Sequence, residues 1–374
     1  MKRILVVFLL FAMVFAASCS KTIPAVNENS QTIVNTPVSV PEIDEGKEEN
    51  VVPPEEIPEE PDPRTERSFL TGLPILPEEK FTRPIALVFN NIKEALPQWN
   101  ISASDIVWEC NMEGGITRLV AIYSGVEKIG TAGSVRSARD YFLDIASIHS
   151  AILVHAGGSP SAYTELEKGN VDNIDGVNMY TIPENTFTRN SEKRYERGYE
   201  HCLETSGDKL AKAIEIRGYD TTLEESYTSP FSFKEEFSVP DYDKAAYEVS
   251  LCHGAYLTTD FIYDDAAHVY YKESFSEPHI DEENEKQLAF ENVLVLFAPH
   301  KVVDEQLRLS IDFVGEGEGI YITAGRSTPI KWTRESALSS ISLFEENGNV
   351  LTLNPGKTHI TLFDSLYKNN ITIK

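Results

Sequence analysis

The segment DIVWECNMEGGITRLVAIYS, residues 105–124, holds two runs of strand-forming residues separated by two glycines. Both runs are rich in β-branched and aromatic residues, and Gly114 with Gly115 can adopt the backbone angles of a tight turn. The pattern predicts a β-hairpin. Glu109 and Glu113 flank the turn and Arg118 leaves it, so this end of the hairpin is either a solvated turn with a charged rim or one wall of a site.

The regions around this hairpin mix strand and helix patterns. Residues 84–90 and 151–156 have the length and composition of strands, whereas residues 134–149, 161–168 and 208–218 show helical spacing and capping residues. This combination predicts an α/β or α+β N-terminal domain.

The chain changes character in the Pro-, Ser- and acid-rich stretch at residues 229–243. The runs that follow are strand-like and separated by turn residues, which predicts a mostly antiparallel β domain. We place the α/β domain at 68–235 and the β-rich domain at 236–374. The predicted strands lie near residues 245–251, 268–274, 292–300, 307–315, 319–325, 327–333 and 358–363.

The predicted helix at 134–149 has an unusual first turn. With a serine as its N-cap, Arg136 and Arg139 fall at the positive end of the helix dipole, where carboxylates are preferred. The two guanidinium groups therefore need compensation from elsewhere. Either Glu109 and Glu113 pair with them, or the arginines hold an anion together with the helix amides.

A second candidate feature is the loop HAGGSPSA at residues 155–162. Gly157 and Gly158 could let backbone amides approach a ligand, and Ser159 is a suitable N-cap for the next helix. A plain capping turn needs the same residues. A nucleophile elbow fits less well, because Ser161 stands where its second glycine belongs.

The N-terminal residues predict a location outside the cytoplasm. Residues 1–19 have a basic start, a short apolar run and small residues before Cys19, which resembles a bacterial lipobox with a lipidated (palmitate-bearing) cysteine. Residues 20–67 predict a disordered tether, with ten acidic residues and one lysine between positions 41 and 62. The net charge of −26 argues against nucleic acid as a partner.

The remaining cysteines give no metal-binding pattern. Cys110, Cys202 and Cys252 form no CxxC pair, so one disulfide with a spare thiol and three free thiols are equally compatible with the sequence. We expect no metal and no cofactor.

Together these segments resemble the YerB-type bacterial lipoproteins. The resemblance is carried by the lipobox, the acidic linker and the blocks RPIALVFNN, EGGITR, VRSAR, HAGGSPSAY and FVGEGEGIYITAGRSTPIKWT. It implies a two-module, membrane-anchored protein whose activity is unknown. Asn90 and Leu96 depart from the family pattern, which has Asp and Arg at these places; the changes remove a carboxylate and weaken an anion pocket.

We therefore expect a lipid-anchored binding protein on the extracytoplasmic face of the cell membrane, rather than an enzyme. An arginine-lined cleft would take an anionic envelope ligand or a protein partner. The alternative is an envelope enzyme acting on a phosphate- or glycan-containing substrate, with a histidine as acid–base; in outline it is similar to the LytR–CpsA–Psr ligases. The candidate site residues are Arg118, Arg136, Arg139, Glu109, Glu113, His155, Gly157, Gly158, Ser159 and His201.

Overall fold

The predicted hairpin forms the centre of the largest sheet. The computed structural model describes residues 62–255 and 257–374, so the predicted signal peptide and nearly all of the predicted tether lie outside the described residues. Strand β4 (Ile106–Asn111) pairs antiparallel with β5 (Thr117–Tyr123) around a turn at Glu113–Gly115. Gly114 and Gly115 both have positive φ there. The hairpin prediction is confirmed.

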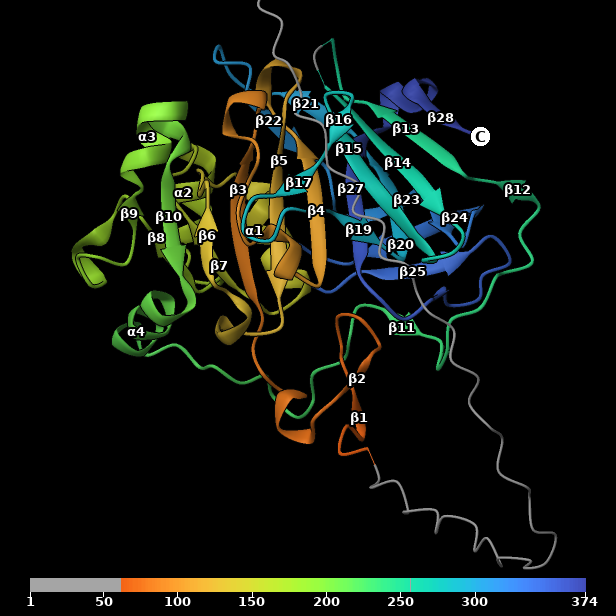
Figure 1. The fold of residues 1–374 in the computed structure, drawn as a ribbon, viewed down its shortest axis with the longest axis horizontal. Coiled ribbons are helices and arrows are strands. Elements are labelled where there is room, and N and C mark those ends of the chain that lie inside the picture. Colours follow the sequence, from red (N-terminus) through yellow and green to blue (C-terminus); the bar gives the residue numbers. More distant parts are fainter. Residues whose placement is uncertain (1–61, 256) are drawn as a thin grey trace, which may run out of the picture. The chain divides into compact units, whose positions relative to one another are not determined.

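This sheet has eleven strands and is mixed (Figure 1). In spatial order the strands on one side of the hairpin are β12 (Lys244–Ala245), β24 (Arg326–Arg334), β23 (Gly315–Thr323), β20 (Asn292–Ala298) and β27 (Thr358–Asp364), with β25 (Ser342–Glu345) beside β24. On the other side they are β3 (Ile85–Asn91), β7 (Ile152–His155) and β8 (Asn173–Asp175). Parallel pairs join β20 to β27, β27 to β4, β3 to β7 and β7 to β8, and the other neighbours are antiparallel.

Helices pack on both faces of this sheet. The α-helices are α1 (Asp140–Ile148), α2 (Pro160–Leu166), α3 (Ser191–Arg197) and α4 (Gly207–Arg217). Side chains of α1 and α2 share a buried apolar cluster with Val88, Trp108 and Val120 of the central strands. The buried side chains of α4 belong instead to the apolar cluster of the opposite face. Helix α4 ends at Gly218 in the left-handed conformation, as its sequence predicts.

A second, antiparallel sheet covers the other face. Its apolar side chains, including Leu251 and Phe261, share a buried cluster with Val107 and Leu119 of the hairpin. Figure 1 shows these strands lying over the blue strands of the large sheet. The strands are β13 (Glu248–Cys252), β14 (Thr258–Asp264), β15 (Val269–Ser274), β16 (Glu277–Pro278), β19 (Ala289–Phe290) and β28 (Ile371–Ile373).

Smaller ribbons complete the strand content. They are β1 (Glu66–Arg67) with β2 (Pro74–Ile75), the trio β6 (Thr131–Gly133), β10 (Leu203–Ser206) and β9 (Thr188–Arg189), β11 (Ser232–Phe233) with β26 (Thr352–Leu353), β17 (Ile280–Asp281) with β18 (Lys286–Gln287), and β21 (His300–Val302) with β22 (Leu309–Ile311).

The structure confirms a strand-rich chain whose C-terminal part is mostly antiparallel. It also adds a feature that the sequence did not predict: strand β27 from the C-terminal part pairs with β4 from the N-terminal part. The two parts therefore share one continuous sheet, and the division near residue 235 stays a prediction.

Candidate functional site

The two arginines of the predicted helix start lie before the helix. The expectation that Arg136 and Arg139 occupy its first turn is wrong: α1 begins at Asp140, and Arg139 is its N-cap residue. The preceding segment is extended, because the amide of Arg136 donates to the carbonyl of Val88 on β3. A carboxylate therefore occupies the first turn, as the helix dipole favours. The apolar spacing of residues 135 and 138 misled the prediction, because an extended chain buries them as well as a helix does.

Arg118 is the most unusual residue of this region. It leaves the turn on β5 opposite Cys110, and only 6% of its surface is exposed. Its Nη1 donates to the carbonyl of Ser137 at 2.7 Å, whereas its Nε has no hydrogen-bond partner among the described residues. Burial, together with the charges of Arg139 and Arg136, lowers the pKa of Arg118 to about 9. Within residues 62–255 and 257–374 it forms no ion pair.

Arg139 and Glu113 form a close ion pair at the edge of this cluster. Arg139 is 5% exposed and also donates to the carbonyl of Ala138. The pKa of Glu113 lies below its usual range: burial acts to raise it, but hydrogen bonding to its own amide and the charges of Arg139 and Arg118 outweigh that effect. The expected pairing of a turn glutamate with the arginines is therefore present for Glu113.

Arg136 lies at the solvent side. Its side chain is 29% exposed and donates to Oε2 of Glu200 at 2.6 Å. The neighbouring His201 lies with Nδ1 3.0 Å from the amide nitrogen of Asn90, so this ring nitrogen accepts the hydrogen bond. Burial and the charge of Arg136 lower the pKa of His201. Because Asn90 is an amide, it adds no negative charge on the strand beside Arg118.

Glu109 is not part of this cluster. Side chains alternate along a strand, and Arg118 pairs with Cys110, so Glu109 faces the opposite side of the sheet. There it is fully buried and lies 3.5 Å from Nζ of Lys272. The expectation that Glu109 compensates the arginines is therefore wrong. Neither Lys272 nor Glu200 was a sequence candidate, because each meets its partner only through long-range packing.

The loop at residues 155–162 uses its polar groups locally. His155 is fully buried, with Nδ1 2.8 Å from the carbonyl oxygen of Gly157. The amide of Gly157 donates to Asp175, and Ser159 caps α2 by accepting from Ala162. These contacts match the capping alternative, and they leave the ligand role of His155, Gly157, Gly158 and Ser159 an untested prediction.

Other features of the described residues add no further chemistry to this region. Cys110, Cys202 and Cys252 are free thiols. Within the described ranges there is no cluster of His, Cys, Asp and Glu side chains that could hold a metal ion. The helices described there are too short or too polar for any of them to cross a membrane. Leu96 lies next to a short turn at Lys93–Ala95.

Comparison with known proteins identifies the family. Residues 70–220 match the family described as "Protein of unknown function (DUF3048) N-terminal domain", and residues 248–360 match its C-terminal domain. The chain is 32% identical over 302 residues to "Putative lipoprotein YerB" of Bacillus subtilis (strain 168), covering 79% of this chain and 86% of the relative. The chain belongs to the YerB family.

A solved structure of this family has the same fold. The crystal structure of the YerB protein from Bacillus subtilis superposes with a TM-score of 0.72 at 30% identity, over 83% of this chain and 99% of the solved chain. The YerB-type resemblance of the sequence is thus confirmed. The family descriptions name no activity.

Proposed function

We propose that this member of the YerB family is held on the extracytoplasmic face of a cell membrane by a lipid on Cys19 and binds an anionic envelope ligand, or an anionic group of a protein partner. The binding residues are Arg118, Arg136 and Arg139, which we call the arginine cluster. The anchor is supported by the lipobox-like sequence and by the name of the relative from Bacillus subtilis.

The observation that carries the binding proposal is the environment of Arg118. A buried cation without a partner costs several kcal/mol, so proteins pair such groups or use them. Arg118 has one hydrogen bond to a carbonyl and two other guanidinium groups close enough to lower its pKa. A bound anion would supply the missing negative charge. A perturbed, partly unsatisfied charge of this kind is typical of a functional site.

The charges of the region favour a small dianion. Three guanidinium groups face the two carboxylates of Glu113 and Glu200, which leaves one positive charge uncompensated. A ligand that displaces Glu113 from Arg139 would meet two. Phosphate groups match this charge, and guanidinium groups bind them in a two-pronged geometry.

Isothermal titration calorimetry of the full-length protein with inorganic phosphate and pyrophosphate tests the binding proposal. We expect binding by the wild type and a loss of at least about tenfold in affinity for Arg118→Gln. The matched control is Arg217→Gln, since Arg217 lies at the end of α4 and contacts Tyr219 and Thr181. Equal affinity in both variants, or no binding by the wild type, would overturn the proposal.

The anchor has its own test. Cys19→Ala should move the protein from the membrane fraction to the soluble extracytoplasmic fraction, because no lipid can then be attached. Cys202→Ala serves as the control, since this thiol is buried inside the fold. Retention of the Cys19→Ala variant in the membrane fraction would contradict lipid anchoring.

The enzyme alternative gains no support from the described residues. The ring nitrogens of His155 contact Gly157 and Asn173. Its Nδ1 also lies 3.8 Å from the carboxylate of Asp175, but both side chains are buried rather than open to solvent. His201 lies beside the arginine cluster, but its Nδ1 is occupied by Asn90 rather than by a carboxylate. An acid–base pair would need an imidazole and a carboxylate in contact in an open pocket. Binding is therefore the function we propose.

A further inference from the structure

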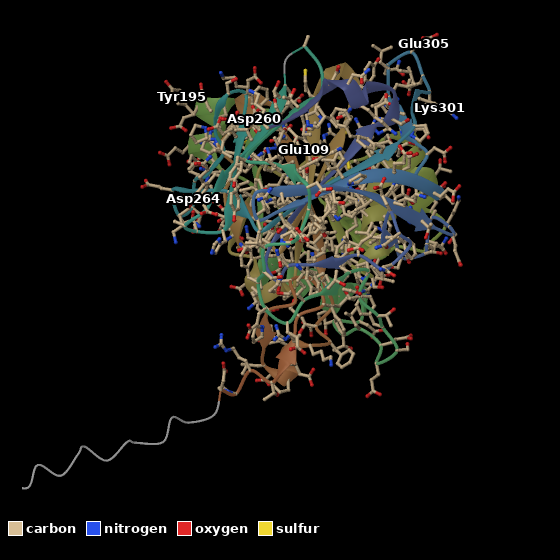
Figure 2. The ribbon with its side chains drawn as sticks, turned by 90° about the vertical axis from the view of Figure 1, so that its right-hand side faces the viewer. Glu109, Tyr195, Asp260, Asp264, Lys301 and Glu305 are labelled. Carbon is tan, nitrogen blue, oxygen red and sulfur yellow. The ribbon has the colours of Figure 1, made fainter. Side chains whose placement is uncertain are left out.

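A second cluster of charged side chains lies between the two sheets, on the face of the hairpin opposite Arg118. Its central residue is Glu109, which is fully buried inside the fold (Figure 2). Oε1 of Glu109 accepts hydrogen bonds from Thr117 at 2.7 Å, Thr259 at 3.0 Å and Asn91 at 3.2 Å. Oε2 lies 3.5 Å from Nζ of Lys272. The carboxylate is therefore surrounded by donors and one cation.

These contacts close into a ring of five side chains, which we call the Glu109 ring. Lys272 Nζ lies 3.1 Å from His279 Nδ1, and His279 Nε2 lies 2.5 Å from Gln98 Oε1. The amide nitrogen of Gln98 donates to Asn91, and the amide nitrogen of Asn91 donates to Glu109. The ion pair between Glu109 and Lys272 completes the ring.

The ring defines the protonation state of His279. An ammonium group can only donate, so Nδ1 of His279 accepts from Lys272. Nε2 then bears the hydrogen and donates to the carbonyl oxygen of Gln98. The imidazole is neutral in this arrangement. A proton added at Nδ1 would remove the acceptor and place two cations 3.1 Å apart.

The ring also joins the two matched regions of the chain. Asn91, Gln98 and Glu109 belong to the N-terminal match, whereas Lys272 and His279 belong to the C-terminal match. Lys272 lies on β15, in the sheet that covers the hairpin. The polar contacts of the ring therefore link the covering sheet to the central hairpin.

Two further imidazoles face Glu109. Nε2 of His359 lies 3.2 Å from its Oε2, and Nε2 of His253 lies 3.8 Å from its Oε1. Both side chains are fully buried, and within the described residues the Nε2 of His253 has no hydrogen-bond partner, whereas that of His359 lies within hydrogen-bonding distance of Glu109. The other titratable groups around the ring are Asp260 near Lys272, and His300, with Asp364, near His253.

The buried charges balance only while the imidazoles are neutral. Glu109 and Lys272 cancel each other, so a proton on any of the three imidazoles adds a buried cation without a second carboxylate in the ring. Burial lowers the pKa of His253 to about 4 and that of His279 well below the ordinary 6.5. Burial also lowers the pKa of His359, although Glu109 opposes this.

We infer that the Glu109 ring is an acid-sensitive latch: it holds the β13–β15 sheet against the central hairpin at neutral pH and opens when His279 and the two imidazoles that face Glu109 take up protons. An opened state exposes these imidazoles to water, where they bind protons below about pH 6.5. The closed state is therefore fully favoured above that value. It loses stability as the pH falls toward the lower values of the folded protein.

Hydrogen exchange of the full-length protein at about pH 7.5 and about pH 5, corrected for intrinsic exchange rates, tests this inference. Peptides covering β14 and β15 should lose about tenfold more protection at the lower pH than peptides covering α1. Uniform loss across the fold, or no loss in β14 and β15, would overturn it.

Substitution separates the latch from general acid unfolding. His279→Gln removes the titrating group and retains an amide that can accept from Lys272, so the difference between the two pH values should shrink. His268→Gln is the matched control, because His268 is an exposed histidine next to β15. If His279→Gln does not fold, His253→Gln and His359→Gln take its place with the same expected direction. An undiminished pH difference in the folded variants would contradict the latch.

Discussion

The two faces of the β4–β5 hairpin bury charges in opposite ways. On one face, the carboxylate of Glu109 has three hydrogen-bond donors and the ammonium of Lys272. On the other face, the guanidinium of Arg118 has one carbonyl and two like charges, and the nearby carboxylate of Glu113 is already paired with Arg139. Burial of a charge is therefore not in itself the sign of a binding site. The distinguishing feature is whether the folded chain supplies the counter-charge.

The largest expected effect comes from removing the cation of the compensated face. Lys272→Met should lower the free energy of unfolding by about 3–5 kcal/mol, because it leaves Glu109 buried and negative. Urea unfolding at neutral pH measures the change.

The double variant Lys272→Met with Glu109→Gln is the control. It removes both charges of the pair, so it should recover at least half of the loss. A loss below about 1 kcal/mol in the single variant would show that the ion pair contributes little and would remove the contrast between the faces.

The opposite sign is expected on the uncompensated face. Arg118→Met should raise the free energy of unfolding by about 1–3 kcal/mol, because it removes a buried charge that the chain does not neutralise. The same variant should lose phosphate binding, so stability and binding change in opposite directions.

Arg334→Met is the matched control for this change. Arg334 is equally buried, but it donates to carbonyls of Ser339 and Phe313 and pairs with Asp144, so its removal should destabilise the fold. If Arg118→Met destabilises as much as Arg334→Met does, Arg118 is an ordinary structural arginine.

The sequence predicts the strands that carry these two faces better than it predicts the side-chain contacts on them. The length and the β-branched and aromatic content of these segments correctly indicated β3, β4, β5 and β7, which are buried along nearly their whole length. Side chains alternate in direction along a strand, and the turn at residues 113–115 pairs Arg118 with Cys110, so Glu109 and Arg118 lie on opposite faces. That signal was present in the hairpin.

Other features could not be read locally. The start of α1 depends on a backbone hydrogen bond from Arg136 to Val88, 48 positions earlier, which keeps the preceding segment extended. The Glu109 ring depends on Lys272 and His279, which lie far along the chain and reach Glu109 only because β15 packs over the hairpin. No periodicity specifies such pairs.

A smaller effect tests whether the carboxylate of Glu113 takes part of the place that a bound anion would occupy beside Arg139. Glu113→Gln removes the carboxylate that pairs with Arg139, so the arginine cluster gains one unit of positive charge. We expect pyrophosphate to bind about fivefold more tightly, measured by calorimetry at constant salt. Glu127→Gln, on an exposed turn beyond the opposite end of β5, is the control. Unchanged or weaker binding would mean that Glu113 helps to form the site rather than competing for it.

The smallest expected effect concerns Arg136, the arginine of the cluster that lies on the solvent side. It is partly exposed and already paired with the solvent-exposed Glu200, and exposed ion pairs contribute little. Arg136→Gln should change the free energy of unfolding by no more than about 0.5 kcal/mol and weaken pyrophosphate binding about two- to threefold. Because a screened charge responds to salt, the weakening should be largest at low ionic strength. An effect as large as that of Arg118→Gln would place the anion at the outer arginine, and the burial of Arg118 would then no longer explain the binding.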